Sequence, residues 1–246
     1  MNERIMYIGA HNDECEYGTG GVAWHLNQLG CRQLFVNPAC LWHDRTLSEE
    51  TKDFWLRQEL AAAAQLGAEK RIPGPRDVQI FRADEQTVEM LESIILEFAP
   101  DIVFIHWPRD NHVEHRKVAK AAFDALCIAH VHGAKFREVY AFEAGPNQTG
   151  DYFKPDFSVD ITAAMPDLRK SLGCFQQNHA DGDSLYREKE CHARYRGHTA
   201  GFDYAECYKI VKFPNGGDDF LLRQLLGDRF RWYGNGMYPA FGEAYF

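Results

Sequence analysis

The chain has 246 residues, of which 45% are hydrophobic and 26% charged, as is typical of one globular domain with a large core. Acidic residues outnumber basic ones, 36 to 27, and the net charge of −9 argues against a nucleic-acid binder, which would carry a basic stripe. We expect no membrane span and no secretory signal, and therefore predict a cytoplasmic protein.

The first 150 residues alternate between strand-like and helix-like patterns. Strands are predicted at 4–10, 34–36, 102–105 and 139–142, and helices at 19–29, from about 46 to 66, at 84–98 and at 113–129. Thr46 to Glu49 has the pattern of a helix capping box, and Gly67 suits the helix end. This alternation predicts an α/β fold with a Rossmann-like, mainly parallel sheet and helices on both faces. In such sheets the active site lies at the carboxyl ends of the strands.

The last hundred residues are less regular. Strands are predicted near 157–161 and 208–213, and helices near 163–175 and 184–196. We treat 1–246 as a single domain with an aromatic-rich C-terminal tail from about residue 214. Seven of the 17 residues from 230 to 246 are aromatic, which is too many to leave in water. The tail therefore packs on the body, on a partner subunit of a homo-oligomer, or across the site entrance.

Two polar clusters follow the predicted strands that begin at residues 4 and 102. The clusters contain imidazole and carboxylate side chains, at His11, Asp13 and Glu14 and at Asp110, His112, Glu114 and His115. Imidazole and carboxylate together bind divalent metals such as zinc, and spare acids can move protons. The carboxyl ends of parallel strands lie at one edge of a sheet, so the sequence predicts one shared metal site there.

These clusters carry a resemblance to a known family. His11-Asn12-Asp13-Glu14 resembles the His-Pro-Asp-Asp motif of the PIG-L/LmbE-like zinc-dependent de-N-acetylases, and His112-Val113-Glu114-His115 resembles their His-Pro-Asp-His motif. Asp110 stands at a matching upstream acid. Arg57-Gln58-Glu59-Leu60 and Arg196-Gly197 with Tyr204-Ala205-Glu206 are similar to further family patterns, so the resemblance reaches to about residue 213.

The resemblance implies a role for each residue of the two motifs. His11, Glu14 and His115 would hold Zn²⁺ or another divalent metal, with one position left for water. Asp13 would be the general base for the attacking water. His112 would stabilise the oxyanion or protonate the leaving amine.

Other residues have supporting roles in this hypothesis. Asp110 or Glu114 would orient His112 and raise its pKa. Arg57, Arg109 and Trp107 are candidate substrate contacts, each with an ordinary structural role as its alternative.

The function implied by the resemblance is metal-dependent hydrolysis of an N-acetyl or other N-acyl group on an amino sugar or glycoconjugate. The sugar rests on the resemblance alone, so an amidase acting on a non-sugar or thiol-conjugate substrate remains an alternative. The chain departs from the family pattern at Asn12, Glu14 and Cys15, where proline, aspartate and glutamate are usual. These departures leave a non-catalytic metal-binding domain as a second alternative.

A dinucleotide-binding function is a further alternative. Gly18-Thr19-Gly20-Gly21 follows the first strand and enters a helix, as in dinucleotide-binding folds. However, acidic residues lie between the strand and the glycines, where they would repel a pyrophosphate. The second strand also ends at Asn37-Pro38 without the acid that binds a ribose.

Overall fold

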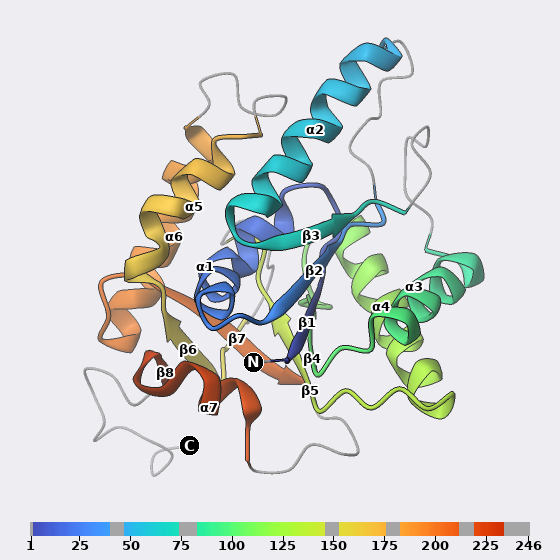
Figure 1. Ribbon diagram of the computed structural model, residues 1–246. Helices are drawn as coiled ribbons and strands as arrows, with labels where there is room; N and C mark the ends of the chain where they lie inside the picture. Colours follow the sequence, from blue (N-terminus) through green and yellow to red (C-terminus); the bar gives the residue numbers. More distant parts are fainter. Residues whose placement is uncertain are drawn as a thin grey trace.

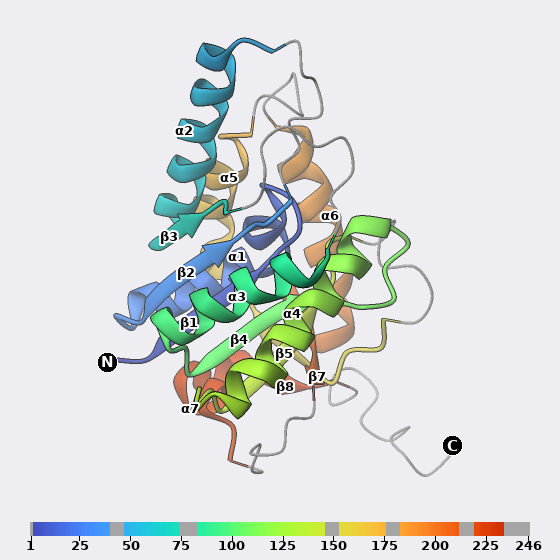
Figure 2. The same ribbon diagram turned by 90° about the vertical axis from the view of Figure 1, so that its right-hand side faces the viewer.

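The computed structural model describes residues 2–39, 47–73, 83–145, 153–175, 183–211 and 219–233. These residues form one sheet with helices on both faces (Figures 1 and 2). The strands are β1 (Arg4–Ile8), β2 (Arg32–Val36), β3 (Ala68–Arg71), β4 (Ile102–His106), β5 (Glu138–Phe142), β6 (Phe157–Asp160), β7 (Ala205–Val211) and β8 (Phe230–Trp232). The helices are α1 (Glu14–Gln28), α2 (Glu49–Gln65), α3 (Glu85–Phe98), α4 (Val113–Val131), α5 (Met165–Leu172), α6 (Ser184–Ala200) and α7 (Leu221–Leu226). None of these described helices has the length and apolar character that crossing a lipid bilayer requires.

The strand order is β3-β2-β1-β4-β5-β7-β6-β8. The five strands from β3 to β5 are parallel, whereas β7, β6 and β8 extend the sheet in antiparallel pairings. The prediction of a mainly parallel, Rossmann-like sheet is therefore confirmed. The sequence analysis missed β3, because its residues Ala-Glu-Lys-Arg contain no apolar run.

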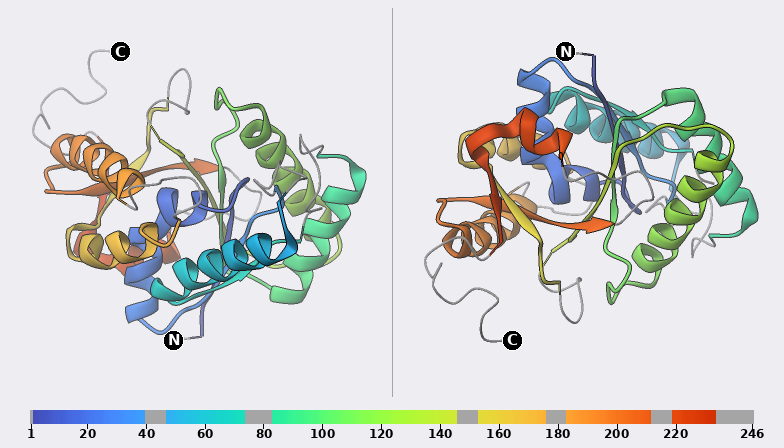
Figure 3. Two further views of the ribbon diagram at one scale, coloured as in Figure 1. Left: turned by 90° about the horizontal axis from the view of Figure 1, so that it is seen from above. Right: turned by 90° about the horizontal axis from the view of Figure 1, so that it is seen from below.

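Helices lie on both sides of the sheet (Figure 3). Alternate residues of each central strand face these opposite layers. In β1, Ile5 and Tyr7 pack in one core with α1, α2 and α5. Met6 and Ile8 pack in a second core with α3 and α4. Since helices cover both faces, the carboxyl ends of the strands, where the polar loops follow, are the edge at which a site can form.

Helix α1 begins at Glu14, five residues before the predicted start, so that prediction was wrong. The glycines that suggested a strand-to-helix loop lie in the middle of the helix. A Cβ atom on Gly18 would lie 2.3 Å from Phe142, and one on Gly21 would lie 2.3 Å from Ile161. These glycines let α1 pack closely against the body, and the dinucleotide alternative loses its main support.

Helix α2 begins after Ser48, whose hydroxyl accepts a hydrogen bond from the Thr51 amide at 3.2 Å. The predicted capping box started at Thr46, which lies outside the described residues; the structure places the N-cap two positions later. In Figure 1 α2 extends well past the end of β3. Its inner face carries Glu59 and two buried alanines, Ala62 and Ala63.

The start of the aromatic tail belongs to the sheet. Strand β8 pairs with β6, and the ring of Phe230 stacks on Phe157 with centroids 4.4 Å apart. Trp232 packs edge-on against both rings. Of the three places predicted for the tail, residues 230–233 thus occupy the body, and residues 234–246 lie outside the described part.

Candidate metal centre

The two polar loops meet because β1 and β4 are neighbouring parallel strands. His11 lies in the loop after β1, and His115 lies in the first turn of α4, after β4. Their ring nitrogens, Nδ1 of His11 and Nε2 of His115, are 3.3 Å apart. Residues 104 positions apart in the sequence therefore share one buried site at the carboxyl edge of the sheet.

Glu14 lies between these two imidazoles. Its Oε1 is 2.6 Å from His11 Nδ1 and also contacts His115 Nε2. Its Oε2 accepts hydrogen bonds from the backbone amides of Ala10 and His11 and from Nε2 of His106, each at 2.7 Å. The longer carboxylate of glutamate thus reaches the position between the two loops.

Asp110 and Glu114 hold the outer nitrogens of the two imidazoles. His11 Nε2 is 2.7 Å from Glu114 Oε2, and His115 Nδ1 is 2.9 Å from Asp110 Oδ2. Such contacts fix the ring orientation and the tautomer, and direct the inner nitrogen of each ring to the centre of the site. Asp110 also accepts a hydrogen bond from the backbone amide of His112 at 2.7 Å.

His112 is placed at the site, but its electrostatics differ from the prediction. The ring centroid is 4.9 Å from that of His11 and 4.4 Å from that of His115, and the residue is half-buried. Burial lowers the pKa of His112, and the neighbouring His115 and His11 lower it further. The net shift is therefore downward, opposite to the prediction: Glu114 raises the pKa of His112 as expected, but burial and the two neighbouring imidazoles lower it by more.

Asp13 is the N-cap residue of α1, and its side chain makes no capping hydrogen bond. Its side chain is half-buried and therefore partly open to solvent. Burial raises the pKa of Asp13, and the adjacent Glu14 raises it further. A simple helix-capping role does not account for this residue.

A buried network supports the turn that carries Asp13. Asn12 donates from Nδ2 to Glu59 Oε1 of α2 at 2.9 Å. Lys70 of β3 donates to the backbone carbonyl of Asn12 and to Glu16 Oε1, the latter at 2.8 Å. The sequence analysis missed Glu59, Glu16 and Lys70 in this role; the polar residue at position 12, where the family has proline, was the available signal.

In the part of the chain that the structure describes, the predicted substrate contacts and Cys15 do not join the cluster of imidazoles and carboxylates. Trp107 follows β4, is half-buried, and packs edge-on against Phe153 with centroids 5.5 Å apart. Arg57 and Arg109 are exposed, and no contact among the described residues joins either side chain to the cluster. Cys15 is buried, its thiol donates to the Tyr7 carbonyl at 3.7 Å, and burial raises the pKa of that thiol, so the side chain is directed at the backbone of β1.

The cluster favours positive charge at its centre. Burial opposes a charge on His11, but Glu14 and Glu114 raise its pKa to about 10. Burial likewise opposes a charge on His115, while Glu14 and Asp110 raise its pKa to about 9. A divalent cation bound between the two imidazoles would balance the charge of the same carboxylates in place of the two protons.

The two inner nitrogens have the spacing that two ligands of a zinc-like ion have. Zinc–nitrogen bonds of about 2.0–2.1 Å at tetrahedral angles place two nitrogens about 3.3–3.4 Å apart, and His11 Nδ1 and His115 Nε2 are 3.3 Å apart. Two groups of the described residues have ligand atoms close enough to hold a metal: His11, His112 and His115, and Glu14, His106 and His115. The ring of His106 also stacks on that of His115, with centroids 4.5 Å apart.

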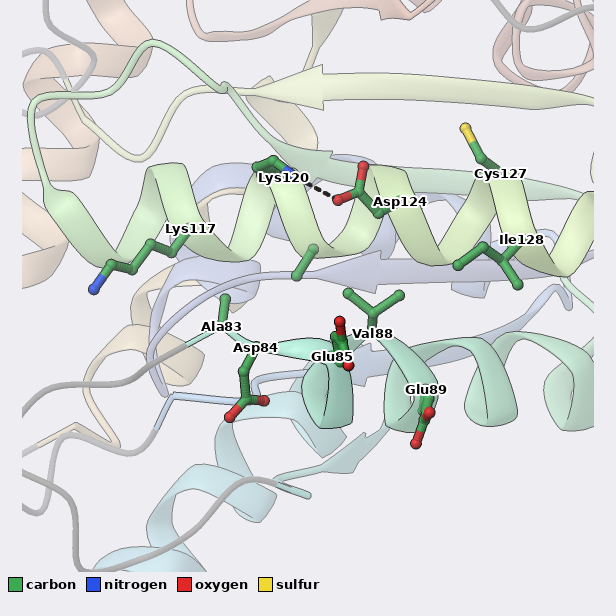
Figure 4. A pocket seen from close by; sticks show the side chains of 11 residues that line it. Ala83, Asp84, Glu85, Val88, Glu89, Lys117, Lys120, Asp124, Cys127 and Ile128 are labelled. Atoms are coloured by element: carbon green, nitrogen blue, oxygen red, sulfur yellow. Dashed lines mark hydrogen bonds and ion pairs between the residues drawn. The ribbon is translucent and has the colours of Figure 1, made fainter.

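A groove between α3 and α4 lies apart from this cluster (Figure 4). Its volume is about 670 Å³, and its walls combine apolar Val88 and Ile128 with the charged pair of Lys120 and Asp124 at the rim. None of the candidate site residues lines it.

Fold and site together define a Rossmann-like α/β protein with a candidate metal centre at the carboxyl edge of its sheet. The family model of PIG-L, described as GlcNAc-PI de-N-acetylase, matches residues 6–126. This segment of the chain is therefore a PIG-L family domain. It contains both polar loops.

Solved structures with the same fold cover nearly the whole chain. The 4-carboxy-2-hydroxymuconate hydratase GalB of Pseudomonas putida KT2440 is 23% identical with a TM-score of 0.73, covering 89% of this chain and 99% of that one. The N,N'-diacetylchitobiose deacetylase of Pyrococcus horikoshii is 20% identical with a TM-score of 0.71, covering 85% and 84%. The A40926 pseudoaglycone deacetylase Dbv21 is 19% identical with a TM-score of 0.61, covering 87% and 99%.

Proposed function

We propose that this protein is a metal-dependent hydrolase that removes an N-acetyl or other N-acyl group from an amino sugar or glycoconjugate. The observation that carries the proposal is the convergence of His11 and His115 at 3.3 Å, with Glu14 between them, inside a PIG-L family domain. The family description names a de-N-acetylase, and two proteins with the same fold are described as deacetylases.

His11, Glu14 and His115 would hold the metal, through Nδ1, Oε1 and Nε2 respectively. Glu114 and Asp110 keep the two imidazoles in the orientation that this requires. When bound, a zinc-like ion polarises a carbonyl group and makes a water molecule more acidic. Both effects are needed because an amide is a poor electrophile.

Asp13 is the general base in this proposal. Its carboxylate takes a proton from the attacking water and passes it to the leaving nitrogen as the carbon–nitrogen bond breaks. His112 donates a hydrogen bond to the oxygen of the attacked carbonyl. The half-buried positions of both side chains leave them accessible to a substrate at the sheet edge.

Three alternatives to this proposal are a different reaction, a different amide substrate, and no catalysis at all. A hydratase has the same fold, so the fold alone does not determine the reaction. A non-sugar or thiol-conjugate amide would use the same residues, because the site residues named here act on the amide rather than on its amine. A non-catalytic metal-binding domain would retain the ligands without using Asp13. The cytoplasmic location and the homo-oligomer stay predictions.

The test is acetate release from a panel of N-acetylated amino sugars and glycoconjugates by the zinc-loaded protein. Asp13→Asn should bind metal normally and lose about 10²–10⁴-fold in rate. Asp124→Asn is the matched control, since Asp124 pairs with Lys120 at the rim of the groove between α3 and α4, apart from the cluster, and it should be fully active. The proposal is wrong if no N-acetylated compound is cleaved, or if Asp13→Asn cleaves as fast as the wild type.

A further inference from the structure

The two oxygens of Glu14 have different surroundings. Oε2 accepts three hydrogen bonds at 2.7 Å, from the amides of Ala10 and His11 and from the ring of His106. A carboxylate oxygen with three donors has little capacity left for a cation. Oε1, in contrast, faces the inner nitrogens of His11 and His115.

His106 is the side chain that completes this arrangement. It is the last residue of β4, and its side chain is 0% exposed. Its ring lies between two neighbours: it stacks on His115, with centroids 4.5 Å apart and 11° between planes, and packs tilted against Phe142, with centroids 4.6 Å apart. Its Nδ1 is buried without a hydrogen-bond partner among the described residues, so Glu14 is the polar group to which this ring is directed.

We propose that His106 is a positioning residue that holds Glu14 as a one-oxygen metal ligand. Glutamate has one more rotatable bond than the aspartate of the family motif, so its carboxylate needs more restraint to present a single oxygen. The Nε2–H group of His106 supplies that restraint by binding Oε2 and leaving Oε1 directed at His11 and His115. The inference rests on the proposed metal site, and it concerns metal affinity rather than the reaction catalysed.

The competing possibility is that His106 is itself a ligand, since its Nε2 is close enough to join Glu14 and His115 around a metal. Two substitutions separate the cases. His106→Phe keeps the stacked ring but has no donor, whereas His106→Gln loses the ring but can still donate to Glu14. A glutamine amide is a far weaker zinc ligand than imidazole.

The experiment measures the dissociation constant for Zn²⁺ by competition with a chromophoric chelator. His106→Phe should bind Zn²⁺ about 10–100-fold more weakly than the wild type, as for other residues that orient a metal ligand. His106→Gln should stay within about threefold of the wild type. His25→Leu is the matched control: His25 is a buried histidine that contacts the Asp160 carbonyl, and its loss should leave the constant unchanged.

Circular dichroism of each metal-free variant reports whether it is folded. If His106→Phe does not fold, the Co²⁺ absorption band of His106→Gln distinguishes the two roles. The band keeps its wild-type position if His106 is not a ligand, and shifts if His106 is a ligand. The inference is overturned if both variants lose metal, which makes His106 a ligand, or if both bind like the wild type. Absence of metal binding by the wild type would instead refute the proposed function.

Discussion

Replacing Lys70 by methionine tests the buried network beneath the candidate base. The Lys70 ammonium donates to Glu16 at 2.8 Å and to the backbone carbonyl of Asn12, next to Asp13. The side chains of Lys70 and Glu16 are both 0% exposed, so water cannot replace either partner. Methionine fills a similar volume but leaves the Glu16 carboxylate without its cation.

The expected cost follows from this burial. Removing one member of a buried ion pair typically costs about 3–5 kcal/mol, because the remaining charge stays in a low-dielectric interior. The loss of Lys70 is especially unfavourable for Glu16, since the second oxygen of this carboxylate already has no hydrogen-bond partner among the described residues. The double variant Lys70→Met/Glu16→Gln removes both charges and should be more stable than the single Lys70→Met variant.

Urea unfolding of the metal-free protein measures the free energy of unfolding without a contribution from bound metal. The four members of the cycle should show a coupling of about 1–3 kcal/mol between positions 70 and 16. A free energy of unfolding for Lys70→Met within about 0.5 kcal/mol of the wild type, or additive effects in the double variant, would refute the reasoning.

Three other predictions concern different parts of the molecule. Glu143→Gln should destabilise the protein at pH 7; burial opposes the charge of Glu143, but hydrogen bonds from partners including Arg196 lower its pKa. The difference in stability between this variant and the wild type should shrink as the pH falls below 4.5, the ordinary pKa of a glutamate, because Glu143 itself then becomes protonated. Thermal unfolding at several pH values would measure this difference. Gly21→Ala should lower the free energy of unfolding by about 1–3 kcal/mol, because its Cβ would lie 2.3 Å from Ile161, and an unaffected urea midpoint would contradict the packing. Cys15→Ser should keep the full zinc content by elemental analysis, and a loss of metal would mean that this sulfur is a ligand.

The position of the site could be predicted because it depends on two features visible in the sequence. Apolar runs at residues 5–9 and 102–105 indicated two strands of one parallel sheet, and such strands bring the residues that follow them to one edge. The structure adds that the two strands are direct neighbours. His11 and His115 could therefore be expected to meet without knowledge of any contact.

The supporting contacts could not be predicted, because they join residues of unrelated sequence context. Lys70 lies in a polar strand without a periodic pattern, and Glu59 is one of several acids on α2. The role of His106 depends on which side of β4 its side chain faces, and on the extra length of Glu14. Such contacts are set by packing between elements distant in the chain.

The glycines of α1 show a different failure. Gly18 to Gly21 were interpreted as the entry to a helix, because they follow the first strand as in dinucleotide-binding folds. The structure places them in mid-helix, where close packing against Phe142 and Ile161 leaves no space for a Cβ atom. Tertiary packing outweighs the low helix propensity of glycine, and the helix starts at Glu14, within the candidate metal centre.

The central claim is that loops more than one hundred residues apart bind one ion. Zinc content of the purified protein, measured by elemental analysis for the wild type, His11→Ala and His115→Ala, tests it most directly. We expect one zinc per chain in the wild type and none in either variant. Full zinc content in either variant would contradict the shared site.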